Sequence, residues 1–153
     1  GMSVQKQIVS ESITIDAPAH VIFDILADPR QHSKIDGSGS VQDVTIGPDR
    51  LSEGARFGAR MKMFGMPYRI TNRVVEFEED ARIAWRHFGG HRWRYLLETL
   101  GDSQTRVTEQ FDYSRHKGLA ARSIEAAKFP ARNREGIQAT LVTLKAVAEG
   151  ESI

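Results

Sequence analysis

Cysteine is absent from this chain of 153 residues. Disulfide bonds, thiolate metal ligands and a cysteine nucleophile are therefore excluded. The five histidines do not fall at a spacing typical of zinc sites. His32 and Asp36 stand four residues apart in an expected short helix, but no third ligand accompanies them. We therefore expect no metal and no cofactor.

Long apolar runs are also lacking. No run approaches the ~20 residues that a membrane-spanning helix needs, and the N-terminus has none of the segments of a signal peptide. These absences predict a cytoplasmic protein without a membrane span. Gly1 before Met2 is interpreted as the remnant of an expression tag, and one domain is expected over residues 2–150.

The chain has no excess of charge of one sign. The 21 basic and 20 acidic residues nearly cancel and are interspersed, so no face is expected to grip nucleic acid or anionic lipid by charge alone. The arginines from Arg82 to Arg94 alternate with apolar residues and are interpreted as solvated outward positions of strands. A nucleophile elbow, a phosphate loop and a dinucleotide fingerprint are absent as well.

The first third of the chain predicts a strand, two short helices and a second strand. Residues 7–15 alternate between apolar and polar side chains, as a half-buried strand does. Asp16 is the expected cap of a helix whose first turn carries Pro18. A second short helix is expected over residues 29–35, and a strand over 41–46.

The middle of the chain predicts a meander of strands whose inward faces follow from parity. A four-residue turn over 64–67 would place Met63 opposite Tyr68. The inward residues change parity later in that strand, so a bulge is expected over 72–74, after which Val75 and Phe77 face inward.

The next two hairpins follow the same reasoning. The apolar residues stand at odd positions in both strands, so a loop with an odd number of residues is needed to keep them on one face. Residues 89–91 are the candidate loop, and they would place Trp85 opposite Tyr95. The following turn sets Tyr95 against Glu109 and Trp93 against Phe111.

The last third predicts a long amphipathic helix. Proline disfavours a helical residue before it, so Pro130 is expected to open the helix after a break at Phe129, and Gly150 to stop it. An apolar stripe lies at helical spacing: Ile137, Leu141, Leu144 and Ala148. An antiparallel meander followed by such a helix is typical of an α+β fold in which the helix covers one face of the sheet.

Several segments carry a family resemblance. The stretch from Ile13 to Pro29, the segments 93–95 and 105–109, and the closing helix over 141–149 resemble the SRPBCC (START-like) superfamily, in its polyketide cyclase/dehydrase and lipid transport branch. The resemblance implies a helix-grip fold, in which a curved seven-stranded antiparallel sheet has two short helices after strand one and a long C-terminal helix over its concave face. It also implies a cavity for lipids, polyketides, hormones or other apolar compounds.

The predicted inward face supplies the candidate ligand contacts. Large aromatic and methionine side chains suit an apolar ligand, although they equally suit a filled core. The candidates are Phe57, Met61, Met63, Tyr68, Asn72, Trp85, His87, Trp93, Tyr95, Glu109 and Phe111.

Three of these candidates could also carry acid/base chemistry. Glu109 beside Tyr95, with His87 nearby, would form the kind of proton relay that a cyclase or dehydrase needs. In the alternative, Glu109 is solvated at the cavity mouth or paired with an arginine, and His87 is exposed at a hairpin tip.

Three functions therefore remain open. The first is binding or transport of an apolar small molecule, and the second is an enzyme of the cyclase, dehydrase or hydrolase kind. The third is a protein-interaction module, since relatives resembling chaperone activators and a ribosome-associated toxin share the fold. The chain is expected to be a monomer or a homodimer.

Overall fold

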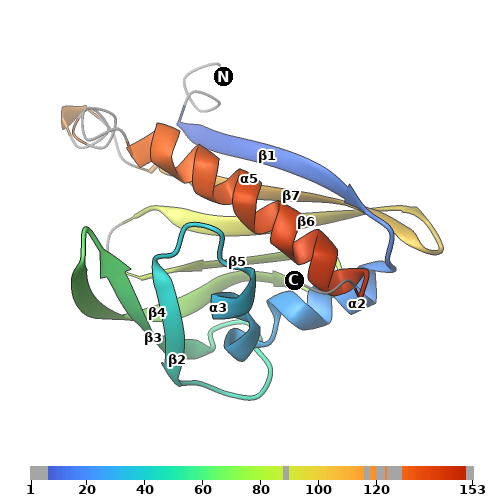
Figure 1. The fold of residues 1–153 in the computed structure, drawn as a ribbon, viewed down its shortest axis with the longest axis horizontal. Coiled ribbons are helices and arrows are strands. Elements are labelled where there is room, and N and C mark those ends of the chain that lie inside the picture. Colours follow the sequence, from blue (N-terminus) through green and yellow to red (C-terminus); the bar gives the residue numbers. More distant parts are fainter. Residues whose placement is uncertain (1–6, 88–89, 116–117, 120–122, 124–128, 151–153) are drawn as a thin grey trace.

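A computed structural model describes residues 7–87, 90–115, 118–119, 123 and 129–150. Seven antiparallel strands form one curved sheet in the order β1-β7-β6-β5-β4-β3-β2, and a long helix, α5, lies across one face (Figure 1). The predicted α+β helix-grip architecture is confirmed. The first two strands in the sequence occupy opposite edges of the sheet, so the segment that joins them crosses the same face as α5.

The bounds of the elements agree closely with the predicted segments. The strands are β1 Ile8–Ile15, β2 Val41–Ile46, β3 Arg56–Met63, β4 Met66–Glu78, β5 Arg82–Arg86, β6 Arg92–Gly101 and β7 Gln104–Asp112. The helices are α2 Ala19–Leu26, the 3₁₀ turn η1 Pro29–Gln31, α3 His32–Ile35 and α5 Phe129–Ala148. Among the described residues, no helix is both long and apolar enough to cross a membrane.

The start of α2 differs from the prediction. The helix begins at Ala19 with Pro18 as its N-cap, so Asp16 is not the capping residue. The Asp16 carboxylate instead accepts a hydrogen bond from Gln104, and the Asp16 backbone N–H donates to Glu149 Oε2 at 2.7 Å. Asp16 thus ties the end of β1 to β7 and to the end of α5.

The β3–β4 hairpin closes with a tighter turn than predicted. Met63 pairs with Met66 and Met61 with Tyr68, so the turn has two residues and the predicted pairing of Met63 with Tyr68 is wrong. The turn residues Phe64 and Gly65 both have positive φ, 52° and 77°, as a type I′ turn requires. Because the error is two residues, the inward face of β4 is still the predicted one.

The predicted bulge in β4 exists but lies slightly later. Val74 pairs with Trp85 and Glu76 with Ala84, so the extra residue is Val75. The ladder is regular through Asn72, and Val74, not Val75, is the fully buried valine. Two adjacent valines fit either parity, and only the pairing with β5 decides between them.

Of the two following hairpins, the first has a register that differs from the prediction and the second has the predicted register. Trp85 pairs with Trp93, so its predicted pairing with Tyr95 is wrong by two residues, while the odd parity that puts both rings inward is right. The connection spans residues 87–91, of which 88 and Gly89 lie outside the described residues. The predicted pairs of β6 with β7, Tyr95 with Glu109 and Trp93 with Phe111, are confirmed.

Helix α5 confirms the predicted stripe and stop. Ile137, Leu141 and Leu144 are buried, and Gly150 ends the helix with φ of 75°. Its N–H donates to the carbonyl of Val147 at 3.1 Å. Phe129, where a break was predicted, is the first residue of α5, and Pro130 lies in its first turn; residues 124–128, which precede the predicted break, lie outside the described residues.

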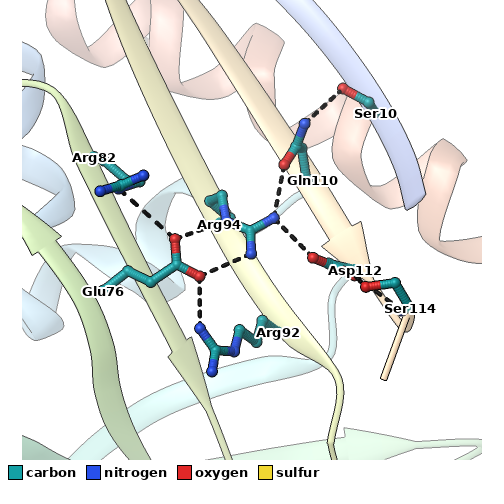
Figure 2. A network of polar contacts seen from close by, with 8 residues as sticks. All are labelled: Ser10, Glu76, Arg82, Arg92, Arg94, Gln110, Asp112 and Ser114. Atoms are coloured by element: carbon teal, nitrogen blue, oxygen red, sulfur yellow. Dashed lines mark hydrogen bonds and ion pairs between the residues drawn. The ribbon is translucent and has the colours of Figure 1, made fainter. Parts of the chain in front are cut away.

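The convex face of the sheet carries a network of charges (Figure 2). Arg94 donates to both oxygens of Glu76, at 3.0 and 2.7 Å, and to Asp112 at 3.0 Å. Arg92 adds a bond of 2.8 Å to Glu76. The Arg94 side chain is only 14% exposed. The interpretation of these arginines as solvated is therefore wrong for Arg92 and Arg94, although they do point outward.

Candidate functional site

A cavity of about 440 Å³ lies between the concave face of the sheet and the helices α3 and α5. Its volume falls within the range of small-molecule sites, about 300 to 1,000 Å³. All eleven residues that the sequence nominated line it: Phe57, Met61, Met63, Tyr68, Asn72, Trp85, His87, Trp93, Tyr95, Glu109 and Phe111. Their presence in the wall is thereby established, whereas a role in binding or catalysis is a separate question.

Burial of the wall decreases along the β3–β4 hairpin toward its turn. Phe57 and Ala59 are 2% and 3% exposed, while Met61, Met63 and Tyr68 are only half-buried. The wall is therefore more exposed near the β3–β4 turn than at the start of β3.

Aromatic rings form the closed part of the wall. Trp85 stands at the centre, with ring centroids 4.6 Å from His32, 5.6 Å from Phe57 and 5.8 Å from Tyr95. Trp93 contacts Phe111 across the neighbouring strands at 4.9 Å. Strand pairing places these rings on one face, and their mutual contacts fix their orientation.

His32 is a wall residue that sequence reasoning missed as a ligand contact. Its ring stacks on Trp85, and Nε2 lies 2.9 Å from the carbonyl oxygen of Leu26. A carbonyl only accepts, so Nε2 carries the proton. Burial lowers the pKa of His32, which favours the neutral ring.

Other wall residues that the sequence did not nominate come from several segments, among them α3 and α5. Ile35 and Asp36 follow from α3, and Asn133, Ile137 and Thr140 project from α5. The helical stripe did indicate that Ile137 is inward, but no pattern indicated which polar residues of α5 would face the sheet. Which polar residues of α5 face the sheet depends on how the helix packs against the loop after α3.

Glu109 is the only buried acid of the concave face among the described residues. It is 5% exposed and lies opposite Tyr95 across the paired strands β6 and β7, where the Tyr95 hydroxyl is close enough to lower its pKa. Its Oε1 is buried with no hydrogen-bond partner in the described structure. The prediction of an inward, buried Glu109 opposite Tyr95 is confirmed, the alternative of a solvated carboxylate is wrong, and no arginine of the described residues pairs with Glu109.

The surroundings of Glu109 favour its protonated form. Burial raises its pKa well above the ordinary value, the hydrogen bond from Tyr95 opposes this, and the negative charge of Asp36 adds to the rise. Burial also raises the pKa of Tyr95, with a further rise from Glu109. A protonated Glu109 presents an O–H donor, and the pair can therefore both give and accept hydrogen bonds inside an apolar cavity.

His87 lies at the end of β5, where the cavity wall meets the β5–β6 connection. It is half-buried, and burial lowers its pKa. Its ring contacts that of His91 at 5.0 Å, and His91 contacts Phe111 at 5.4 Å. The expectation of an exposed His87 is thus wrong, because the histidine rings pack against the aromatic wall.

The loop after α3 closes one side of the cavity against α5. The Gly37 N–H donates to Thr140 Oγ1 at 2.9 Å, and a methyl group on Gly37 would meet Ala139 Cβ at 2.4 Å. The Asp36 carboxylate holds the loop by accepting from the backbone N–H groups of Ser38 and Val41. Only glycine allows so close an approach of loop and helix.

A metal centre finds no support in the described part of the chain. No three His, Asp or Glu side chains there are grouped so that they could hold an ion. Asp36, which the sequence analysis considered with His32 as a possible metal ligand, accepts hydrogen bonds from the loop through both of its carboxylate oxygens.

Comparison with known families gives one match over nearly the whole chain. The family described as polyketide cyclase/dehydrase and lipid transport matches residues 6–149. The uncharacterized protein Rv0088 of Mycobacterium tuberculosis is 44% identical over 140 residues. These residues are 89% of this chain and 62% of that protein, so the chain spans less than two thirds of its relative.

Solved structures share the fold at low sequence identity. A START superfamily protein from Mycobacterium smegmatis superposes with a TM-score of 0.70 at 15% identity, covering 94% of this chain and 97% of its own. The ZhuI aromatase/cyclase from a Streptomyces species gives a TM-score of 0.66 at 19% identity, with 93% of both chains covered. At such identity the likeness concerns the fold alone.

Proposed function

Because the chain belongs to the polyketide cyclase/dehydrase and lipid transport family, we propose that it binds an apolar small molecule in the cavity between the sheet and α5. The observation that carries the proposal is the cavity itself, of about 440 Å³. A space of this volume inside a protein is ordinarily filled by side chains, because protein interiors pack densely and empty space lowers stability.

The wall indicates the class of ligand. Four aromatic rings and two methionines from the sheet offer apolar, adaptable contact, as binding sites for apolar compounds do: Phe57, Trp85, Trp93, Phe111, Met61 and Met63. Among the described residues of the wall there is no lysine or arginine, so a ligand with a free carboxylate or phosphate would find no permanent counter-charge from them. We therefore propose a neutral ligand.

Glu109 and Tyr95 give the ligand a place for one polar group. The buried Oε1 of Glu109 has no partner in the described structure, and an unsatisfied buried polar atom costs about 1 to 3 kcal/mol. A ligand hydroxyl or carbonyl at this oxygen would remove that cost. The proposed ligand is thus an apolar, neutral compound with at least one hydrogen-bonding oxygen directed at Glu109.

Native mass spectrometry of the freshly purified protein tests the proposal. We expect a complex heavier than the bare chain, from which a neutral small molecule is released on activation. A second measurement uses an apolar fluorescent probe, displaced by polycyclic aromatics bearing a hydroxyl group more strongly than by the parent hydrocarbons. A protein that carries no molecule and binds no probe would contradict the proposal.

A pair of tryptophan substitutions separates cavity binding from surface binding. Met61→Trp adds bulk to the cavity wall and should weaken probe binding about tenfold or more, since the probe then competes with the new ring for space. Val142→Trp adds the same ring to the outer surface of α5, where Val142 is 62% exposed, and should leave binding unchanged. Equal effects of the two variants would place the probe outside the cavity.

An enzyme is the second candidate, and the Glu109–Tyr95 pair favours it. A carboxyl group with a raised pKa in a water-poor cavity is suited to general acid chemistry near neutral pH. The proposed roles are proton donation by Glu109, support of its orientation by Tyr95, and proton exchange at the cavity end by His87.

The two candidates make different predictions for Glu109→Gln. An enzyme would retain unreacted substrate in the variant, so the released molecule should differ in mass from that of the wild type. A binding protein would release the same molecule from both, with a lower occupancy in the variant. Tyr95→Phe provides a second variant at the same site that keeps the ring.

A further inference from the structure

The outer face of the β3–β4 hairpin concentrates positive charge. Strand pairing sets Arg56 opposite Arg73 and Arg60 opposite Arg69, with Lys62 beside them, and all five are exposed. Residues 55–75 contain no acidic residue. Like charges directly opposite on neighbouring strands destabilise a sheet, so this arrangement is unfavourable for the isolated fold.

Neutralising partners are scarce around these cations. Arg60 lies 3.7 Å from Asp43, and within the described residues the other four cations form no ion pair. The outer face of β4–β7 is different, because Glu76 and Asp112 neutralise its arginines. The near-zero net charge of the chain therefore hides an uncompensated positive surface on one hairpin.

The turn of the same hairpin is apolar. Phe64 is 77% exposed and Met66 is 69% exposed. Phe64 also occupies a turn position with φ of 52°, which asparagine or glycine favours and large side chains rarely adopt. Arg132 of α5 lies over its ring, 4.3 Å from the centroid. The ring remains 77% exposed despite this contact, and the turn geometry does not favour a phenylalanine at this position.

We propose that the β3–β4 hairpin docks on the surface of an anionic lipid bilayer. Phe64 and Met66 enter the interface, where exposed apolar side chains gain by leaving water. The four arginines and Lys62 of the outer face contact lipid phosphates, each cation adding to the attraction. An apolar tip next to basic residues fits a membrane better than a nucleic acid, whose recognition rests on phosphate contacts and base stacking.

Docking would bring the bilayer close to a half-buried part of the cavity wall. Met61, Met63 and Tyr68, on the inner face of the same hairpin, are half-buried wall residues. A ligand dissolved in the bilayer would then pass between membrane and cavity with a short exposure to water. This link to ligand exchange rests on the proposed function, whereas docking itself does not.

Sedimentation with vesicles tests the docking. The full chain should sediment with vesicles of phosphatidylcholine and phosphatidylglycerol, and not with phosphatidylcholine alone. Raising the salt concentration should weaken the binding, because it screens the exposed charges. A protein that sediments equally with both kinds of vesicle, or with neither, would overturn the proposal.

Charge-reversal variants locate the surface. The double variant Lys62→Glu, Arg69→Glu should weaken binding to the anionic vesicles by at least about tenfold. The matched control Lys34→Glu, Arg106→Glu makes the same change of charge at exposed cations on α3 and β7 and should change binding far less. Equal losses in the two variants would show a general charge effect and overturn the assignment to the hairpin.

Phe64→Asn separates docking from folding. Asparagine followed by glycine is a favoured type I′ turn, so this variant should fold at least as stably as the wild type while losing several-fold in vesicle affinity. Unchanged affinity would contradict insertion of the tip. Salt-sensitive binding to single-stranded DNA that survives Phe64→Asn, without vesicle binding, would identify a nucleic-acid surface instead. Probe binding without vesicles should be unaffected in all these variants, so failure of docking is distinguishable from failure of the cavity proposal.

Discussion

The two faces of the sheet treat a buried carboxyl group in opposite ways. On the concave face, burial raises the pKa of Glu109, and the described residues of the cavity wall include no lysine or arginine. On the convex face, burial also favours the neutral form of Glu76, but hydrogen bonds from Arg94 and Arg92 outweigh it and lower the pKa. The comparison teaches that neighbouring cations can outweigh the effect of burial on the charge of a carboxyl group.

The two faces also differ in whether their polar groups are fully hydrogen-bonded. The convex network is mutually satisfied, and Figure 2 shows Arg94 joining Glu76 of β4 to Asp112 of β7 across β6. It contributes rigidity to the sheet behind the cavity. On the concave face, Glu109 Oε1 has no hydrogen-bond partner in the described structure. A ligand in the cavity can therefore supply the missing hydrogen bond on this face.

Removing the central cation should give the largest effect. Arg94→Met would leave Glu76 and Asp112 buried without their shared partner, and the free energy of unfolding should fall by about 3 kcal/mol. Urea denaturation at neutral pH measures the change. Arg82→Met, at a side chain 46% exposed and 3.7 Å from Glu76, is the control, with an expected loss below about 1 kcal/mol. Similar losses in both variants would erase the distinction between the network and ordinary surface charges.

Removing the anion should have the next largest effect. Glu76→Gln keeps the shape but leaves Arg92 and Arg94 short of a counter-charge, with an expected loss of about 2 kcal/mol at neutral pH. The folded pKa of Glu76 lies below its unfolded value, so its stabilising effect is present above the unfolded pKa and is lost as pH falls through the folded pKa. The wild type should therefore lose more stability than Glu76→Gln on acidification. Parallel pH profiles from denaturant titrations would contradict this.

Glu109→Gln should show the opposite pH dependence. The folded pKa of Glu109 lies above its unfolded value, so its contribution to stability is fully present below the unfolded pKa and is lost as pH rises through the folded pKa. Relative to the variant, the wild type should lose at most about 1.4 kcal/mol per pH unit over that window. A wild type that instead gains stability over the variant with rising pH would mean that Glu109 is ionised in the folded state.

Tyr95→Phe should give the smallest change in stability, a loss of about 1 kcal/mol from one hydrogen bond. Because that bond lowers the pKa of Glu109, its loss should raise this pKa further and extend the pH range over which stability falls. The pH profile of unfolding measures both effects. No change in the profile would show that the hydroxyl contributes nothing to the state of Glu109.

The sequence predicted faces better than registers. Parity placed Trp85, Tyr95 and Glu109 inward, because a strand alternates whatever its partner. The pairing of Trp85 was wrong by two residues, since loop length, and not the hydrophobic pattern, sets the register and the pattern repeats every two residues. The type I′ turn went unrecognised because Phe64 stands where a turn residue was expected.

The site was predicted from the sheet side alone. Each strand residue in the wall carries a periodic signal, whereas His32 and Thr140 enter the wall through the packing of helices against one another. Likewise, alternation indicated that Arg94 points outward but not that Glu76 and Asp112 would meet it there. Such contacts depend on residues distant in the sequence, and a single sequence carries no pattern for them.

The close contact of Gly37 with α5 has a kinetic consequence. A distance of 2.4 Å between a hypothetical Gly37 methyl and Ala139 Cβ means that loop and helix meet backbone to backbone, and Gly136 repeats the approach at Ser38. Loop and helix are therefore too close here for a ligand to pass without a movement of the backbone. A molecule held in the cavity would exchange through another part of the wall, so its exchange rate should respond to changes in the half-buried β3–β4 hairpin more than to changes in side chains along this seam.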